Sequence, residues 1–359
     1  MRILFITRKY PPSIGGMEIF SQSLYEALRQ SGVKIDIHKP RQAIMGRPSI
    51  PVIGRFFFGA SWILLRHGRN YDIVLLGDFA IASLAVVAKV STFGKIRVAI
   101  SLHGNDLYFR RKGSIKAAVY KWICSCATRS HAIDVAIANS KAIQAEALAS
   151  GMDEVLVIPL ATTVPSIQSL AGPGKPHILL YVGRLIRYKG LSWFVEAVWP
   201  RLGAGFELHV AGPAWDASEL ECLRDKPGIV YLGEIEHDEL PPLRRKALAC
   251  IMPNLPPLHS DQNEGFGLAA LESAAVGTPV IASNLGGLAE AVVDGVTGFL
   301  VEPLDADMFV ARILMVAGWD EARRTEFATA ARQTIAEHFT WGRVANDYIA
   351  EFERLIHSG

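Results

Sequence analysis

The chain has 359 residues, of which half are hydrophobic, and its 37 Lys and Arg nearly balance 35 Asp and Glu to leave a net charge of +2. This length suits two domains with large buried cores, which excludes a disordered chain and a small disulfide-stapled domain. The four cysteines show no metal-ligand spacing, so we expect reduced, mostly buried thiols and no bound metal.

The charge is unevenly distributed along the chain. Residues 1–165 carry 21 Lys and Arg against 10 Asp and Glu, a net +11, whereas the remainder carries 16 against 25, a net −9. This asymmetry indicates two domains with different partners. The sequence lacks helix-turn-helix, zinc-finger and RNA-binding aromatic signatures, so nucleic acid is not the expected partner. An anionic membrane surface or a phosphate-bearing acceptor fits the basic half better.

Short apolar runs alternate with helical patterns through the first half of the chain. The runs end at small or polar residues and lie at 2–7, 34–38, 72–77, 97–104, 135–140 and 155–160. Such alternation predicts βαβ units and a parallel sheet with both faces covered. The start of the chain is too soon charged for a signal peptide, and the longest apolar run, 79–88, is well short of the ~20 residues that span a bilayer. We therefore expect a cytoplasmic protein, with peripheral attachment at the inner face of the membrane if the basic half binds lipid.

A Pro, Gly and Ser-rich stretch at 165–177 reads as a linker, after which the alternation begins again. The new apolar runs lie at 178–183, 206–212, 228–233, 249–254, 279–283 and 298–301. The tail, 339–356, has the pattern of one amphipathic helix. The fold class predicted is therefore α/β, with two doubly wound parallel-sheet domains in tandem.

In open α/β sheets, ligands bind beyond the carboxyl ends of the strands. The stretch "YVGRLIRYKG" ends a strand at Gly183 and then supplies Arg184 and Lys189. A forked guanidinium donor and a point charge together suit a diphosphate, although a basic surface turn has the same pattern. In the first half, the glycine pair Gly15 and Gly16 and the side chain of His103 also follow strands. A tight turn and a structural histidine are the alternatives there.

The stretch "EGFGLAALE" places Glu264 before a helix that begins near Gly267, and Glu272 two turns along it. The two carboxylates lie about 80° apart around the helix, which argues against a close acid pair. They suit hydroxyl groups instead, while the free N–H groups of the helix end suit an anion. The alternative is one acid favoured by the helix dipole and one solvated helix glutamate, and spacing alone leaves both interpretations open. No G-x-G-x-x-G follows a strand, and no P-loop or G-x-S-x-G motif occurs.

Taken together, these stretches resemble the retaining glycosyltransferases of family 4 (glycosyl transferases group 1). The resemblance extends over nearly the whole chain and rests on the following stretches, in the family's order: "YPPSIGGME", "SLHGND", "ANS", "YVGRLIRYKG", "VAG", "YLGEI", "EGFGLAALESAAVGTPVIAS", "NLGGLAEAVVDGVTGFLVEP" and "FTWGRVANDY". It implies the GT-B fold, two Rossmann-like domains facing across a cleft. Residues 1–165 with 340–359 would bind the acceptor, and residues 170–339 would bind the nucleotide sugar.

The resemblance also implies roles for individual residues. Arg184 and Lys189 would bind the donor diphosphate, Glu264 the transferred sugar and Glu272 the ribose, with His103 near the sugar. Further donor contacts are implied at Gly15, Gly16, Gly183, Glu234, Phe266, Gly267 and Leu268. The departing phosphate would accept the acceptor's proton on the leaving-group face, so the anomeric configuration is retained without a metal or cofactor. Two stretches depart from the family pattern: "PLATT" (159–163) stands where P-N-G-V-D is common, and Pro213 stands where a small residue is usual.

The expected activity is hexose transfer from a UDP- or GDP-linked sugar to a saccharide hydroxyl, with a lipid-linked acceptor of polysaccharide or lipopolysaccharide assembly favoured over a soluble one. GDP-mannose, UDP-glucose and UDP-N-acetylglucosamine stay open as donors. A sugar-nucleotide epimerase and a non-catalytic nucleotide-binding module are the competing functions.

Two stretches of the first half are both basic and aromatic. Within 54–69, one side of a predicted helix carries Arg55, Arg66, Arg69 and Trp62, and 108–122 is also basic and aromatic. Both stretches suit anionic lipid, although a buried helix with one basic exposed face fits 54–69 equally well.

Overall fold

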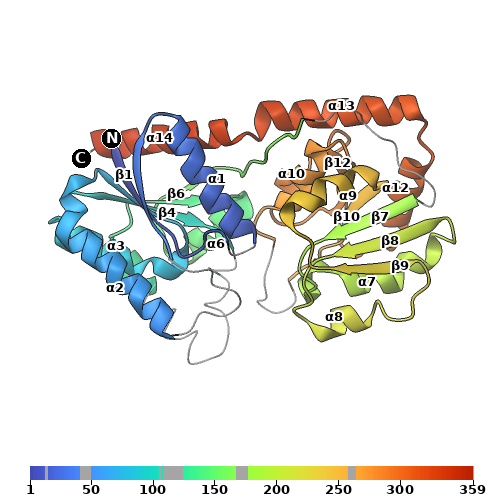
Figure 1. Cartoon of the computed structure of the whole chain (residues 1–359), viewed down its shortest axis with the longest axis horizontal. Helices are drawn as coiled ribbons and strands as arrows, with labels where there is room; N and C mark the ends of the chain where they lie inside the picture. Colours follow the sequence, from blue (N-terminus) through green and yellow to red (C-terminus); the bar gives the residue numbers. More distant parts are fainter. Residues whose placement is uncertain are drawn as a thin grey trace. The chain divides into compact units, whose positions relative to one another are not determined.

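The computed structural model describes residues 1–12, 15–40, 50–104, 107, 124–166, 177–257 and 264–358. The chain divides into two compact units, the first formed by Met1–Leu160 with Trp341–Gly359 and the second by Ala161–Thr340. In Figure 1, each unit is a sheet with helices packed against its faces. The basic stretch 108–122 and most of the expected linker lie outside the described residues.

The first unit is built on a parallel sheet in the order β2-β1-β3-β4-β5-β6. Its strands are β1 (Arg2–Ile6), β2 (Lys34–His38), β3 (Ile73–Leu76), β4 (Arg97–Leu102), β5 (Val135–Ala138) and β6 (Val155–Val157). The described helices of more than one turn are α1 (Gly16–Gln30), α2 (Ile50–His67), α3 (Ser83–Ser91), α6 (Lys141–Ala149) and α14 (Trp341–His357). The strand order reverses between β1 and β3, which makes the ends of these two strands the expected ligand position.

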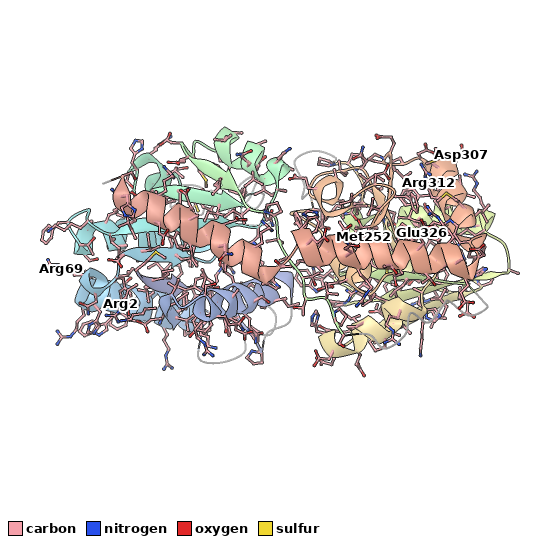
Figure 2. The ribbon with its side chains drawn as sticks, turned by 90° about the horizontal axis from the view of Figure 1, so that it is seen from above. Arg2, Arg69, Met252, Asp307, Arg312 and Glu326 are labelled. Atoms are coloured by element: carbon pink, nitrogen blue, oxygen red, sulfur yellow. The ribbon has the colours of Figure 1, made fainter. Side chains whose placement is uncertain are left out.

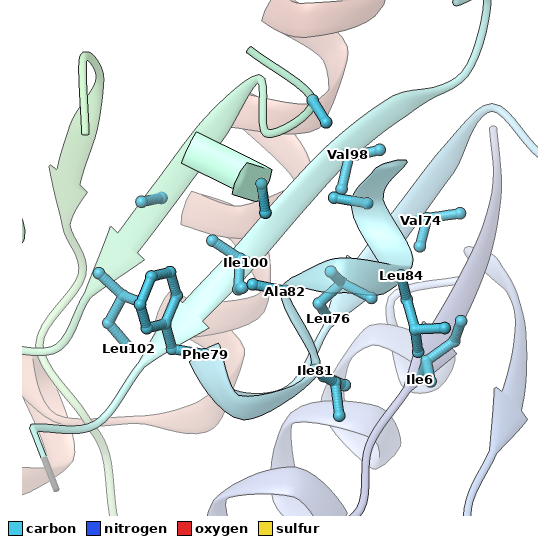
Figure 3. Close-up of a cluster of buried hydrophobic side chains, with 14 of the residues drawn as sticks. Ile6, Val74, Leu76, Phe79, Ile81, Ala82, Leu84, Val98, Ile100 and Leu102 are labelled. Atoms are coloured by element: carbon cyan, nitrogen blue, oxygen red, sulfur yellow. The ribbon is translucent and has the colours of Figure 1, made fainter. Parts of the chain in front are cut away.

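The core of the first unit lies between its sheet and the helices α2 and α3. Figure 3 shows the side chains of Val74, Leu76 and Ile100 meeting Phe79 and Leu84, all at most 1% exposed. The central strands are continuous apolar runs because both of their faces are covered. The C-terminal helix α14 packs in the same unit, where the Tyr348 hydroxyl lies 3.0 Å from Oγ of Ser101 and both groups are buried.

The second unit has a parallel sheet in the order β12-β11-β10-β7-β8-β9. Its strands are β7 (His177–Val182), β8 (Phe206–Ala211), β9 (Ile229–Gly233), β10 (Ala249–Met252), β11 (Val280–Ser283) and β12 (Gly298–Val301). Its helices are α7 (Leu191–Ala197), α8 (Ala217–Glu221), α9 (Leu240–Lys246), α10 (Leu268–Ala275), α11 (Leu288–Ala291), α12 (Ala306–Ala317) and α13 (Glu321–His338). The order reverses between β7 and β10, so this sheet has its own switch point.

The predicted α/β class with two doubly wound parallel sheets is confirmed. Most of the expected strands extend past the observed ones by one to three residues, whereas those at 34–38 and 298–301 coincide with them. Side-chain caps account for several helix starts: Ser140, Asp305 and Asp320 each accept a hydrogen bond from a backbone N–H three residues ahead. Among the described residues, no helix is both long enough and apolar enough to cross a membrane.

Candidate active site

The candidate site lies at the switch point of the second sheet, where glycines let three strand ends approach closely. The Gly183 N–H donates to Ala211 at 2.9 Å, and the Gly212 N–H donates to Gly233 at 2.7 Å. A Cβ on Gly212 would collide with the carbonyl oxygen of Gly183, so only glycine fits there. Arg184 follows directly, at the carboxyl end of β7.

A short turn, η4 (Arg187–Lys189), carries Lys189 and is held against the chain that follows β10. The Leu255 N–H donates to the Tyr188 carbonyl at 2.8 Å. Gly190 ends the turn at φ 73°, and a Cβ there would collide with the Pro253 carbonyl. This close approach brings Lys189 to the loop before α10.

The Lys189 ammonium and the Glu264 carboxylate form an ion pair in which each side chain is only 13–14% exposed. Asn254 supports the carboxylate by donating from Nδ2 at 3.2 Å. Burial is the largest single influence on the pKa of Lys189 and lowers it, but the charges of Glu264 and Tyr188 and the hydrogen bond to Glu264 together outweigh burial, so the pKa is raised. Burial likewise raises the pKa of Glu264, yet the charge and hydrogen bonds of Lys189 and Asn254 lower it overall. Both groups are therefore held in their charged forms.

Arg184 contributes a second cation to the same site. Its guanidinium lies 4.6 Å from the centroid of the Trp215 ring, and its carbonyl accepts a 3.0 Å hydrogen bond from the Tyr181 hydroxyl. Its charge contributes to the lowered pKa of Glu264 and partly opposes the rise in the pKa of Lys189. Arg184, Lys189 and Glu264, which the sequence singled out separately, thus lie together.

Glu272 pairs with Arg244, a residue that the sequence analysis missed. The Arg244 guanidinium donates to Glu272 from α9, and the Arg244 side chain is 2% exposed whereas that of Glu272 is 14% exposed. The interpretation of Glu272 as a solvated helix glutamate is therefore wrong, because a buried cation holds its carboxylate. Three consecutive basic residues end α9, and nothing in the sequence distinguishes the buried Arg244 from its exposed neighbour Lys246.

The first turn of α10 presents backbone N–H groups from which no described residue accepts a hydrogen bond. Gly267 precedes the helix at φ 103°, where a Cβ would lie 2.6 Å from Leu288. Within the described part of the chain, the N–H groups of Phe266, Gly267 and Leu268 have no acceptor. The Phe266 side chain is buried and its ring lies 6.4 Å from that of Phe339, which anchors the turn. The positive, N-terminal end of α10 therefore lies beside Glu264, with its N–H groups available to an anion.

The structure places the other candidate residues elsewhere. Glu234 follows β9, is exposed, and forms no ion pair with any residue that the structure describes. His103 lies in the first unit, where Nε2 is 2.9 Å from the Gly77 carbonyl and the ring packs edge-on at 4.5 Å from Phe20. Gly15 and Gly16 begin α1 in that unit, and a Cβ on Gly15 would meet the Glu18 carboxylate.

The switch point of the first sheet carries charged residues that the sequence analysis did not identify. Arg8 and Asp78 follow β1 and β3, and Nε of Arg8 lies 2.9 Å from Oδ1 of Asp78, which is fully buried. Lys9 pairs at 2.9 Å with Glu18, whose side chain is 5% exposed. In the sequence, Arg8, Lys9 and Asp78 are marked as candidate site residues only by their position after predicted strands.

The cysteines follow expectation in part. Cys124 and Cys250 are buried and Cys222 is half-buried, but Cys126 is exposed, so the expectation of buried thiols is wrong for Cys126. Burial raises the pKa of Cys222 to about 11, which keeps it a thiol near neutral pH. No group of three or more His, Cys, Asp or Glu suited to a metal is formed by the residues that the structure describes.

Two sequence-family models match this chain. The sequence model of the family described as Glycosyl transferases group 1 matches residues 176–318, and that of Glycosyltransferase Family 4 matches residues 14–162. Glycogen synthase of Mycobacterium tuberculosis is 37% identical over 177 residues, which cover 47% of this chain and 41% of that protein. The match therefore spans less than half the length of that relative.

Two solved structures share the fold along the whole chain. Sucrose-phosphate synthase from Thermosynechococcus elongatus superposes with a TM-score of 0.77 at 20% identity and covers 100% of both chains. An Anabaena protein in complex with UDP and glucose superposes with a TM-score of 0.71 at 17% identity, covering 98% of this chain and 99% of that one.

Proposed function

Because the chain belongs to the group 1 glycosyltransferases of family 4 and has the GT-B fold, we propose that it transfers a hexose from a nucleotide-diphosphate sugar to a saccharide hydroxyl. One observation carries the proposal. Two cations, a carboxylate and an open helix end lie together at the switch point of the second sheet. That set matches a ligand with a diphosphate centre and hydroxyl groups at either side.

In this proposal, the charge that develops on the departing β-phosphate is stabilised by Arg184, Lys189 and the first N–H groups of α10. Preorganised donors of this kind contribute about 3 kcal/mol each to the transition state. An ammonium has three N–H donors, so Lys189 can bind a phosphate oxygen while it keeps Glu264. The observed pair then positions both groups before the donor arrives.

The carboxylates bind hydroxyl groups on the two sides of the diphosphate. Glu264 is proposed to accept from the transferred sugar, and Glu272, held by Arg244, from the ribose. Further donor contacts are proposed at Gly183, Glu234, Gly15, Gly16 and His103. With the departing phosphate as proton acceptor, the reaction retains the anomeric configuration and uses neither a metal nor a cofactor.

The acceptor is proposed to be a lipid-linked saccharide of cell-surface polysaccharide or lipopolysaccharide assembly, bound by the first unit. The excess of basic residues over residues 1–165 supports this, because such acceptors are presented at anionic surfaces. The Anabaena neighbour holds UDP and glucose. UDP-glucose is therefore the first donor to test.

The test is a thermal-shift panel of UDP, GDP and their sugars, followed by a transfer assay with the stabilising donor. A specific ligand raises the melting temperature by mass action, and the corresponding monophosphate is the control because it lacks the β-phosphate. We expect one diphosphate to stabilise the chain more than its monophosphate. Failure of every nucleotide to do so would overturn the proposal, and conversion of the donor without any acceptor would indicate an epimerase.

A further inference from the structure

Helix α2 is apolar on two opposite sides. Phe56, Ala60 and Leu64 are buried in the core of the first unit. Phe58, Trp62 and Leu65 are 72%, 56% and 62% exposed, and the helical repeat places them within about 60° of each other, opposite the buried face. A helix that is apolar all round is normally enclosed, yet this face is open to solvent. The expected buried helix with one basic exposed face is present, and that exposed face carries large apolar side chains beside the arginines.

The exposed apolar surface continues onto the turn after α3. Phe93 is 79% exposed and has φ 55°, a left-handed conformation that is unusual for a bulky side chain. The Arg69 guanidinium lies over its ring at 5.1 Å, which connects this turn to the end of α2. Phe58, Trp62, Leu65 and Phe93 are called the α2 ridge. Burial within the unit does not offset the strain at Phe93, because its ring faces solvent.

Cations border the α2 ridge, and acidic residues are absent from the sequence on either side of it. Arg55, Arg66 and Arg69 are exposed, and none of them forms an ion pair with another described residue. The sequence has no Asp or Glu between Asp36 and Asp72, or between Asp78 and Asp106. Figure 2 shows Arg69 at the margin of the first unit. The ridge is therefore apolar at its centre and positively charged along its border.

We propose that the α2 ridge is a membrane-docking face that inserts into the headgroup region of an anionic bilayer. The aromatic and leucine side chains enter the boundary with the acyl chains, while the arginines bind lipid phosphates. A fluid bilayer accommodates protruding side chains of unequal length, and the one-sided charge complements anionic lipid. This inference rests on the proposed function and deepens it. Docking would hold the first unit at the membrane surface, where a lipid-linked acceptor is presented.

The test measures co-flotation of the full chain with vesicles of phosphatidylcholine alone and of phosphatidylcholine mixed with phosphatidylglycerol. One variant combines Phe58→Gln, Trp62→Gln and Leu65→Gln, and a second combines Arg55→Gln with Arg66→Gln. Leu148→Gln is the apolar control, because Leu148 is 47% exposed elsewhere in the same unit, and Arg29→Gln is the charge control. Because all these side chains are exposed, the variants should keep the wild-type fold, which circular dichroism checks.

We expect the wild type to float with the anionic vesicles only. The triple variant should bind at least about tenfold more weakly, because burial of one such side chain alone gives about a tenfold effect. The arginine variant should also bind more weakly, with less sensitivity to salt, and the controls should bind as the wild type does. Brominated lipid should quench wild-type fluorescence more than that of Trp62→Phe.

Equal flotation of the wild type and the triple variant would overturn the inference, as would no flotation at all. Analytical ultracentrifugation adds a further outcome: a wild-type dimer that the triple variant dissociates, without vesicle binding, would make the ridge a self-association face instead. Calorimetry with UDP and GDP on the same preparations separates the two proposals. Nucleotide binding without flotation defeats docking alone, and flotation without nucleotide binding defeats the proposed function alone.

Discussion

Lys189 and Glu264 are 75 residues apart in the sequence and form an ion pair in the second unit, with both side chains largely shielded from water. Lys189 comes from the turn after β7, and Glu264 from the loop before α10. The pair joins the cation expected at the donor phosphate to the carboxylate expected at the sugar. The charge and burial of this pair, and the turn that holds Lys189, lead to the expectations for stability, pH dependence and turnover given below.

The losses in stability from removing the two members of this pair should not be additive. Glu264→Gln leaves a shielded ammonium without its counter-charge, and we expect a loss on the order of 3 kcal/mol in the free energy of unfolding. The double variant Lys189→Met with Glu264→Gln should lose less than the sum of the single variants. Urea unfolding measures all three. Glu326→Gln is the control, because its exposed pair with Arg323 is worth at most about 1 kcal/mol. Strict additivity would contradict the expectation.

The same pair should give a flat stability contribution at neutral pH that disappears at both extremes. The pKa of Glu264 is lowered below its usual 4.5, so its contribution is complete above that value and is lost as the pH falls through the lowered pKa. The pKa of Lys189 is raised above 10.5, so its contribution is complete below that value and is lost as the pH rises through the raised pKa. The difference in unfolding free energy between wild type and double variant, followed against pH, checks this. A difference that peaks between pH 5 and 9 contradicts it.

Arg184→Ala should reduce turnover far more than stability. If its guanidinium stabilises the departing phosphate, turnover should fall about 100- to 1000-fold. The lost contact with Trp215 should cost only about 0.5–1 kcal/mol. The matched control is Arg187→Ala, an exposed cation in the neighbouring turn, which should leave turnover near that of the wild type. Steady-state kinetics and thermal unfolding of both variants give the answer, and similar losses in the two would refute the assigned role.

Glu272 should recognise the ribose of the donor through its hydroxyl groups. We expect Glu272→Ala to weaken binding of the stabilising nucleoside diphosphate about 10- to 100-fold, since hydrogen bonds to a charged group contribute about 1.5–3 kcal/mol. The affinity of Glu272→Ala for the 2′,3′-dideoxy analogue should equal that of the wild type, because the analogue lacks the hydroxyl groups that Glu272 would bind. Arg244→Gln should act in the same direction by releasing Glu272, whereas Lys246→Gln should have no effect. Calorimetry measures both ligands, and an equal loss for the analogue would exclude the ribose role.

Gly190 should be intolerant of a side chain for a reason beyond its backbone conformation. Gly190 and Gly203 have φ of 73° and 76°, but a Cβ collides with the Pro253 carbonyl only at Gly190 and meets nothing within 4 Å at Gly203. Gly203→Ala should therefore cost about 1–2 kcal/mol, the conformational term alone. Gly190→Ala should cost more and should also reduce turnover, because the turn that carries Lys189 must move. Equal losses in unfolding free energy would show that the collision relaxes freely.

Local patterns were enough to predict the elements of the fold and several site residues. The strand that ends near Gly183 and the helix that begins near Gly267 could both be predicted, because apolar runs and glycine-rich turns specify structure within a few residues. The positions of Arg184, Lys189 and Glu264 after strands followed from the same patterns. Arg244 was missed because its burial depends on how α9 packs beside α10, a contact that leaves no mark within "LRRK".

The sequence by itself determined the α/β class, the two parallel sheets and the residues that follow the strands. Only the tertiary structure decided which of those residues meet. The pairing of β7 with β10 brings Lys189 to Glu264, and helix packing buries Arg244 behind Glu272. The same packing leaves Phe58 and Trp62 exposed while it buries Phe56 on the same helix. The physical reason is range: hydrogen-bonded periodicity and turn chemistry are local, whereas strand order and burial depend on contacts between distant parts of the chain.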